Sequence, residues 1–179
     1  MYHIQPDKRA QKSAALILEG LQRCMADKRY ESVTITDICM SSTVSRATFY
    51  RLFDTKDDVI SWGMDLFIED FCTRISGRSM REKLESYFAA WMANPDMLDM
   101  ITVIRREDIS RENRRKRIRL LEQHFMMMSL SDHHVMILAA AMTSLLTDWT
   151  QSSRKESPAE LTDAFMRVIG DLNACFNEA

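Results

Sequence analysis

Apolar residues recur every three or four positions along most of this chain, with polar residues between them. This period is typical of amphipathic α-helices. The first stripe falls in a helix expected over residues 7–27 and comprises Ala14, Ile17, Leu18, Leu21 and Met25. No run of residues alternates apolar with polar in the way of a half-buried strand. The pattern therefore predicts an all-α protein.

Two short helices joined by a tight turn are expected after the first helix. Thr34 and the acidic residue three positions later have the spacing of a capping box, which opens a helix. The polar residues 41–43 end that helix, and Ser45 caps the next one. Phe49 and Phe53 lie four apart, on the face that the second helix would bury. This arrangement predicts a helix-turn-helix.

Longer amphipathic segments fill the rest of the chain. They predict further helices over residues 55–75, 80–93, 96–106, 110–128, 131–149 and 157–176. Thr55 and Ser157 are each followed three residues later by an acidic side chain, so both begin a helix with a capping box. Gly77 and Pro95 mark natural breaks between helices. The whole chain is expected to form about nine helices.

Composition excludes several classes of protein. The chain has 179 residues, a net charge of −2, four glycines and three prolines, which suits one compact two-part unit. Its cysteines show no metal-ligand spacing, so reduced, buried thiols and no metal site are expected: Cys24, Cys39, Cys72 and Cys175. The first residues lack the apolar core of a signal peptide, and no apolar run is long enough to cross a membrane. A soluble, cytoplasmic protein is expected.

Nothing in the sequence points to catalysis. His133 and His134 form a pair at a helix start, and His124 has no carboxylate at metal-binding spacing. No glycine-rich phosphate loop, nucleophile arrangement or pair of acids stands out. The chain is expected not to be an enzyme and to need no cofactor.

The second helix of the helix-turn-helix has a face suited to DNA. Ser45, Arg46, Ala47 and Thr48 lie at its exposed start, where a helix in the major groove meets base edges. Arg46 is the expected sequence reader, because a guanidinium group matches O6 and N7 of guanine. Residues 1–60 hold nine Lys or Arg against eight Asp or Glu. This small positive balance agrees with a DNA-binding N-terminal segment.

The same residues carry a resemblance to a known family. The segment from Val44 to Phe53, followed by Lys56, resembles the DNA-binding domain of the TetR family of bacterial repressors. Ten residues fit the family pattern: Thr34, Ile38, Val44, Ser45, Thr48, Tyr50, Phe53, Lys56, Asp57 and Val59. Cys39 and Ser42 replace the usual alanines, and Thr43 replaces a glycine that would make a positive φ easy. Either the turn is re-formed around Thr43, or Thr43 is strained.

The resemblance implies a set of DNA contacts. Thr48, Tyr50 and Lys56 align with family positions that hold phosphates, and Thr34 is a further candidate for a phosphate contact. The full predicted interface comprises Thr34, Ser45, Arg46, Ala47, Thr48, Tyr50, Arg51 and Lys56. Packing or helix capping is the alternative role for Thr48 and Tyr50, and a purely structural role is as well supported for Arg51. The implied DNA-binding domain covers residues 1–54.

Residues 55–179 are then expected to form a regulatory and dimerisation domain. A small-molecule pocket would be lined by Met64, Phe67, Phe71, Phe88, Trp91, Met92, Met97, Met100 and Phe125, which serve equally well as ordinary core. A homodimer interface would use Leu138, Met142, Leu145, Trp149, Phe165, Val168, Ile169 and Leu172, whose stripes alternatively only close the monomer core. A dimer would place two recognition helices about one DNA turn apart.

The densest basic run lies outside the helix-turn-helix, at residues 105–119. On a helix its cations would spread around most of the circumference, so they form no single groove-facing stripe. A solvated, partly salt-bridged helix is the favoured interpretation, with an anionic effector or a partner protein as the alternative. Neutralising Arg114, Arg115 and Arg117 is expected to leave operator affinity nearly unchanged.

The sequence thus predicts a transcriptional regulator, favoured as a ligand-responsive repressor that binds a palindromic DNA operator as a homodimer, with no membrane partner. One alternative is a coactivator of the same fold that acts through a partner protein and does not read DNA. A second is a helical ligand-binding protein without any DNA contact, for which the sequence offers no positive sign.

Overall fold

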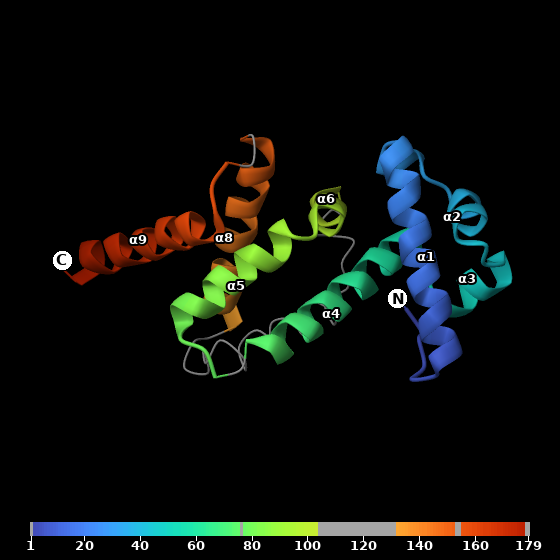
Figure 1. Ribbon diagram of the computed structural model, residues 1–179, viewed down its shortest axis with the longest axis horizontal. Coiled ribbons are helices and arrows are strands. Elements are labelled where there is room, and N and C mark those ends of the chain that lie inside the picture. Colours follow the sequence, from blue (N-terminus) through green and yellow to red (C-terminus); the bar gives the residue numbers. More distant parts are fainter. Residues whose placement is uncertain (1, 76, 104–131, 153–154, 178–179) are drawn as a thin grey trace. The chain divides into compact units, whose positions relative to one another are not determined.

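The computed structural model describes residues 2–75, 77–103, 132–152 and 155–177. Every helix and strand assignment in these ranges is helical, apart from a single bridge between Tyr2 and Phe53. The predicted all-α fold is therefore confirmed (Figure 1). The helix expected over residues 110–128, the basic run at 105–119 and Phe125 lie outside the described residues.

The chain divides into two compact units, which are described separately. The first, here called the head, comprises Met1–Phe67 with Asp99–Arg115. The second, here called the body, comprises Ile68–Leu98 with Lys116–Ala179. The head extends past residue 54 because the first turns of the next helix belong to its core. The functional division predicted at residues 54 and 55 stays a prediction.

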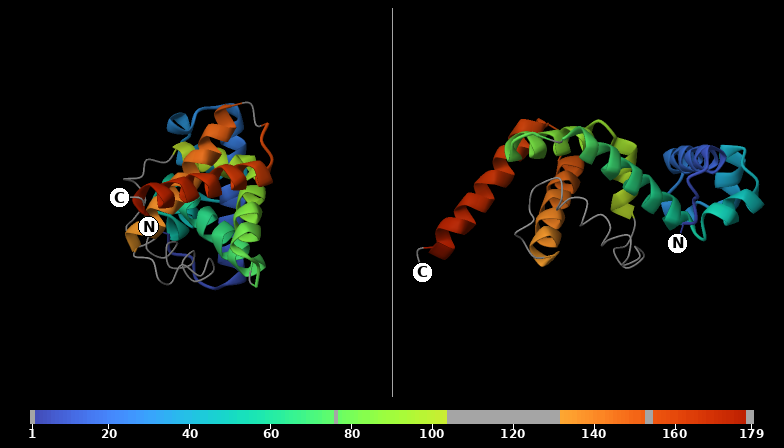
Figure 2. Two further views of the ribbon diagram at one scale, coloured as in Figure 1. Left: turned by 90° about the vertical axis from the view of Figure 1, so that its left-hand side faces the viewer. Right: turned by 90° about the horizontal axis from the view of Figure 1, so that it is seen from below.

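The head is built around a three-helix core. Its elements are α1 (Lys8–Asp27), the 3-10 turn η1 (Tyr30–Ser32), α2 (Ile35–Ser42), α3 (Arg46–Leu52) and the start of α4 (Lys56–Arg74). In Figures 1 and 2, α2 and α3 lie together beside α1. Only three residues separate α2 from α3, which is the short connection of a helix-turn-helix.

The helix starts follow the predicted caps. Asp7 accepts hydrogen bonds from the backbone amides of Arg9 and Ala10 at the start of α1. The boxes of Thr34 and Thr55 are both formed, at the starts of α2 and α4. Each cap satisfies amides that the first turn of a helix leaves without a partner.

The head's core is aromatic and aliphatic. The α1 stripe is confirmed, since Ala14, Ile17 and Leu21 have no exposed surface. Phe49 and Phe53 are also fully buried, as predicted, with ring centroids 5.8 Å apart. Residues from every head element complete this cluster: Ala10, Cys24, Tyr30, Val33, Ile38, Cys39, Leu52, Val59, Ile60, Trp62 and Met100. Burial of this surface is the main force that holds α3 in place.

Gly20 brings α1 and α2 into close contact. A Cβ atom at this position would lie 2.8 Å from Cβ of Ser42 and 3.1 Å from the carbonyl oxygen of Ile38. No side chain fits at such distances without moving α2. Beside this contact, Arg23 of α1 donates a hydrogen bond of 2.6 Å to the carbonyl oxygen of Ser41. The end of α2 is therefore fixed just before the turn.

The first residues of the chain form hydrogen bonds to the end of α3 and to α4. The amide of His3 donates to the carbonyl oxygen of Leu52 at 2.8 Å. The hydroxyl of Tyr2 donates to the carboxylate of Asp65 in α4 at 2.6 Å. These bonds connect α3 to α4 through a segment whose sequence pattern predicted no structure.

Thr43 adopts a left-handed backbone conformation, with φ 57° and ψ 23°. The amide of Val44 donates to the carbonyl oxygen of Cys39 at 3.2 Å, and the amide of Thr43 to that of Met40 at 3.4 Å. These two bonds are those of a Schellman motif, which ends a helix and usually has glycine at the left-handed position. The turn therefore keeps the geometry that glycine would adopt without strain, and Thr43 carries strain.

Replacing Thr43 with glycine is expected to stabilise the head by about 0.5–1 kcal/mol. The change relieves a left-handed Cβ contact that costs about 1–2 kcal/mol, and this exceeds the extra chain entropy of glycine when unfolded, about 0.5–1 kcal/mol. Urea unfolding measures the difference. Thr36→Gly is the control: Thr36 is exposed in α2, and glycine there should destabilise by about 0.3 kcal/mol. A Thr43→Gly protein less stable than the wild type would contradict the strain.

The body contains α5 (Met80–Met92), α8 (Asp132–Gln151) and α9 (Pro158–Asn177), besides parts of α4 and α6 (Pro95–Val103). An aromatic cluster joins α4, α5 and α9. The ring of Tyr87 lies 5.7 Å from those of Phe71 and Phe88, and Phe88 lies 6.5 Å from Phe165. Arg81 pairs with Asp163 at the surface, so α5 and α9 also meet through an ion pair.

Three of the cysteines are free and buried, as predicted: Cys24, Cys39 and Cys72. Burial raises the pKa of the Cys72 thiol to about 11, which keeps it protonated and unreactive. Over the ranges that the structure describes, no helix is both long and apolar enough to cross a membrane.

Candidate nucleic-acid interface

The α3 helix separates a buried face from an exposed one. Phe49 and Leu52 point into the head's core, with at most 2% of their surface exposed. Arg46, Ala47 and Arg51 are exposed and lie outside that core. A short helix held by its aromatic face and presenting small and cationic residues has the form of a recognition helix.

Side-chain hydrogen bonds cap the start of α3. Ser45 accepts a hydrogen bond from the amide of Thr48 at 3.2 Å, and its hydroxyl lies 3.0 Å from the hydroxyl of Thr48. Tyr50 is 48% exposed and packs the edge of its ring on Phe49, 5.6 Å between centroids. Thr48 thus takes part in capping α3 and can still belong to the predicted interface.

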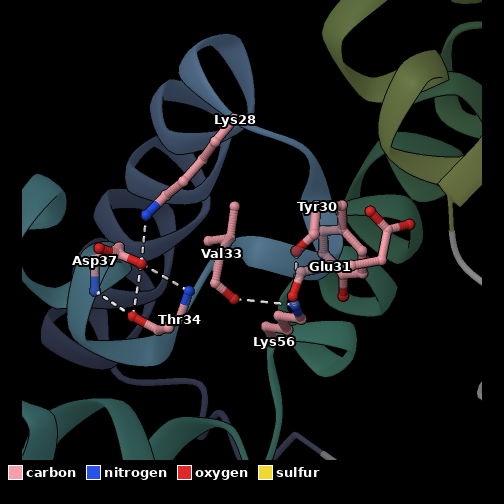
Figure 3. Close-up of polar contacts among 7 residues, drawn as sticks. All are labelled: Lys28, Tyr30, Glu31, Val33, Thr34, Asp37 and Lys56. Atoms are coloured by element: carbon pink, nitrogen blue, oxygen red, sulfur yellow. Dashed lines mark hydrogen bonds and ion pairs between the residues drawn. The ribbon is translucent and has the colours of Figure 1, made fainter.

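Thr34 lies at the start of α2, and its polar groups are engaged within the capping box. Its amide and its hydroxyl donate to the carboxylate of Asp37 at 2.8 and 2.6 Å. The same carboxylate accepts a bond of 2.6 Å from Lys28, the residue that follows α1 (Figure 3). Because the Thr34 hydroxyl is already donated, a phosphate at this place would meet the remaining amides of the first turn and the positive end of the helix dipole.

We expect the Asp37 network to make the stability of the head depend on pH. The hydrogen bond from Lys28, followed by those from Thr34, holds the pKa of Asp37 well below its usual 3.8. The unfolded chain therefore binds the proton more tightly, so Asp37 stabilises the fold above about pH 4 and this contribution is lost as the pH falls toward the folded-state pKa.

Asp37→Asn is expected to lower stability at neutral pH and to flatten the loss of stability below about pH 4. Urea unfolding at a series of pH values measures both effects. Asp27→Asn is the matched control, because Asp27 is an exposed residue at the end of α1. If the free energy of unfolding changed with pH in the same way for the wild type and Asp37→Asn, the network would not contribute to the pH dependence of stability.

Lys56 occupies the first turn of α4, and its ammonium group faces the protein. It donates to the carbonyl oxygens of Tyr30 at 2.7 Å, Val33 at 3.0 Å and Glu31 at 3.4 Å (Figure 3). A role in binding phosphate stays a prediction, and it would require Lys56 to leave these acceptors.

The residues predicted to line a ligand pocket fall into both units. Met100 is buried in the head's core, and Met64 packs against that core. Phe71, Phe88 and Trp91 belong to the aromatic interior of the body. Met97 is buried, whereas Phe67 and Met92 are half-buried. All of these described residues have a packing role, and the pocket stays a prediction.

The predicted dimer residues divide into buried and exposed groups. Met142, Trp149 and Phe165 are buried within the single chain, so for them the alternative of a monomer core applies. Val168 and Ile169 of α9 are 57% and 37% exposed. Leu138 and Leu145 are half-buried, and the side chain of Leu172 lies outside the described part of the chain. An apolar α9 surface is therefore open in the monomer.

Sequence patterns missed several residues of these surfaces. Ile137 and Met166 are exposed apolar residues of α8 and α9, at 66% and 39%. Both residues lie beside the predicted stripe on their helices, and this position could have identified them from the sequence. Tyr30 was also missed, because it lies in a short 3-10 turn without periodicity. Within the described ranges, no group of three or more His, Cys, Asp or Glu side chains is placed to bind a metal ion.

Comparison with solved structures shows the fold. The fatty acid degradation regulator FadR from Bacillus halodurans has a TM-score of 0.66 at 15% identity, over 86% of this chain and 96% of that one. FadR from Bacillus subtilis, in complex with stearoyl-CoA, has a TM-score of 0.64 at 16% identity, over the same shares. The TetR family regulator PfmR from Thermus thermophilus has a TM-score of 0.52 at 19% identity, over 94% of this chain and 96% of that one.

Sequence comparison places the similarity in the head. No curated protein matches the chain. Residues 17–61 match the family model of bacterial regulatory proteins of the tetR family, a segment that runs from the middle of α1 into α4 and includes the entire helix-turn-helix. The head therefore carries the helix-turn-helix domain of the tetR family, and the chain shares its helical fold with transcriptional regulators.

Proposed function

We propose that this regulator is a repressor that binds a palindromic DNA operator as a homodimer. The observation that carries the proposal is the exposed start of α3, where Arg46 and Ala47 stand on a helix fixed by Phe49 in the core. Ser45, Thr48, Tyr50 and Arg51 extend the same surface, and the first turn of α2 at Thr34 adds backbone amides for phosphate. We expect it to act in the cytoplasm.

A turn distorted at Thr43 would favour the coactivator alternative. That turn has the left-handed geometry and the two hydrogen bonds of the usual motif, so the substitution gives no reason for α3 to lose its position. This favours direct DNA reading over action through a partner protein alone.

Selection from a pool of random duplex DNA tests this function. Wild-type protein is expected to enrich a palindrome whose half-sites lie about one helical turn apart. The Arg46→Ala protein is expected to enrich a relaxed sequence or none. Failure of the folded wild-type protein to enrich any sequence at about 100 mM salt would contradict operator binding, because specific regulators bind well at such salt.

We place the dimer interface on α8 and α9. Val168, Ile169 and Met166 leave an apolar surface on α9 that a second copy would cover, and a two-fold interface buries the same patch on both chains. This apolar surface is continuous with the buried side of α9, where Phe165 packs on Phe88.

A chain carrying Val168→Asp and Ile169→Asp is expected to be monomeric and to bind operator DNA at least about tenfold more weakly, since paired half-sites no longer share one protein. Sedimentation velocity gives the oligomeric state, and fluorescence anisotropy gives the affinity. Leu66→Asp is the control, because Leu66 is a 44% exposed apolar residue of α4. A doubly substituted protein that stays dimeric would place the interface elsewhere.

A small-molecule effector is proposed to bind the body. The similar fold of Bacillus subtilis FadR holds stearoyl-CoA, and release of DNA would follow if a ligand favours a spacing of the two recognition helices that no longer matches successive grooves. Operator affinity measured with and without fatty acyl-CoA tests this ligand class first, and an unchanged affinity would remove it.

A further inference from the structure

The three N–H donors of the Lys56 ammonium group can all find acceptors within the protein. A lysine ammonium has three N–H donors, and Lys56 directs its Nζ at three carbonyl oxygens, those of Tyr30, Glu31 and Val33. These carbonyls surround η1, and Figure 3 shows them converging on Nζ. A cation at the carbonyl end of a helical turn is favourably placed.

Two neighbouring residues of α4 hold Tyr30 by different parts of its side chain. Lys56 Nζ lies 4.2 Å from the centroid of the Tyr30 ring, within the range of a cation–π interaction. The Tyr30 hydroxyl donates to the carboxylate of Asp57. Tyr30 is itself 7% exposed and part of the head's core. The first turn of α4 thus contacts both the backbone carbonyls of η1 and the side chain of Tyr30.

These contacts adjoin the start of α2. η1 ends at Ser32, and the next residues are Val33, which Lys56 contacts, and Thr34, which caps α2. From the other side, Lys28, the residue that follows α1, forms an ion pair with Asp37 in the first turn of α2. The start of α2 is therefore held between two lysines, one following α1 and one on α4.

We propose that Lys56 is a positioning residue for DNA recognition: it fixes η1 and the start of α2 and does not itself bind a phosphate. The role in recognition rests on the proposed function, whereas the hold on η1 does not. Lys56 is distinguished from the exposed cations of the head by its three backbone acceptors.

Hydrogen exchange of the free protein tests the hold on η1. Lys56→Met is expected to speed exchange of the Val33 amide, which bonds to Tyr30, and of the Ile38 amide in α2, by about tenfold or more. Lys155→Met, an exposed position before α9, removes the same charge and should leave both rates unchanged. Unchanged rates in Lys56→Met would overturn the proposal.

The salt dependence of DNA binding tests the absence of a phosphate contact. Lys56→Met is expected to bind the selected duplex at least about fivefold more weakly, with the slope of log K against log salt concentration unchanged. A phosphate contact would reduce that slope by about 0.9 for each subunit, and such a reduction would overturn the proposal.

Lys56→Arg gives an independent answer with a variant that keeps the charge. An arginine retains a phosphate contact, but its planar donors do not converge on one cluster of carbonyls as an ammonium does. Weaker binding with faster exchange is expected, and full affinity would overturn the proposal. If the wild-type protein binds no duplex, the proposed function fails instead, and the exchange rates still decide whether Lys56 holds η1.

Discussion

Phe49→Ala is expected to destabilise the head by about 3–5 kcal/mol, a cost typical of truncating a buried aromatic residue. Phe49 has no exposed surface and contacts the rings of Phe53 and Tyr50. Its loss would leave a cavity beneath α3 that the neighbouring rings cannot fill without moving. Since small domains are stable by only about 5–15 kcal/mol, much of the head would unfold at moderate temperature.

Urea unfolding, followed by circular dichroism, measures this loss, and operator binding should fall with the folded fraction. Tyr50→Ala is the matched control, because it removes an aromatic side chain from the neighbouring, 48% exposed position. That variant should stay nearly as stable as the wild type while losing affinity for DNA. Equal loss of stability in both variants would mean that α3 is not oriented as described.

Arg46→Ala is expected to remove most of the preference for the operator while leaving the head folded. Arg46 is exposed at the first position of α3, one residue after the Ser45 cap. A bidentate contact to guanine discriminates by about 1–3 kcal/mol, so two subunits would contribute about 2–6 kcal/mol. Non-specific affinity, which depends on phosphates, should change much less.

Competition between the selected duplex and random-sequence DNA measures this preference directly. Arg9→Ala is the control, since Arg9 is an exposed cation of α1 and lies outside the recognition helix. A preference that survives Arg46→Ala but is lost in Arg9→Ala would move the reading surface from α3 to α1.

Local features of the fold were predictable from the sequence. The caps at Thr34, Thr55 and Ser157 each join residues three apart, so their geometry is decided within one turn. The inward faces of α1 and α3 were predictable for the same reason, because helical period alone places Phe49 and Phe53 on one side.

Features set by contacts between distant residues were not predictable. The choice between a re-formed turn and a strained Thr43 depended on Gly20 and Arg23 of α1, which fix the end of α2. Lys56 matched a phosphate-binding position in sequence, yet its acceptors lie 23 to 26 residues away. Burial of Met100 in the head, likewise, follows from tertiary packing that a helical stripe does not reveal.

The central claim, that the start of α3 reads bases, is tested most directly by a double-mutant cycle between Arg46→Ala and the selected duplex. Each guanine of the operator is replaced in turn by 7-deazaguanine, which lacks the N7 acceptor. The account predicts that at one guanine per half-site the two changes are non-additive, with a coupling of about 1 kcal/mol or more. Additive effects at every guanine would contradict it and would assign base recognition to another part of the protein.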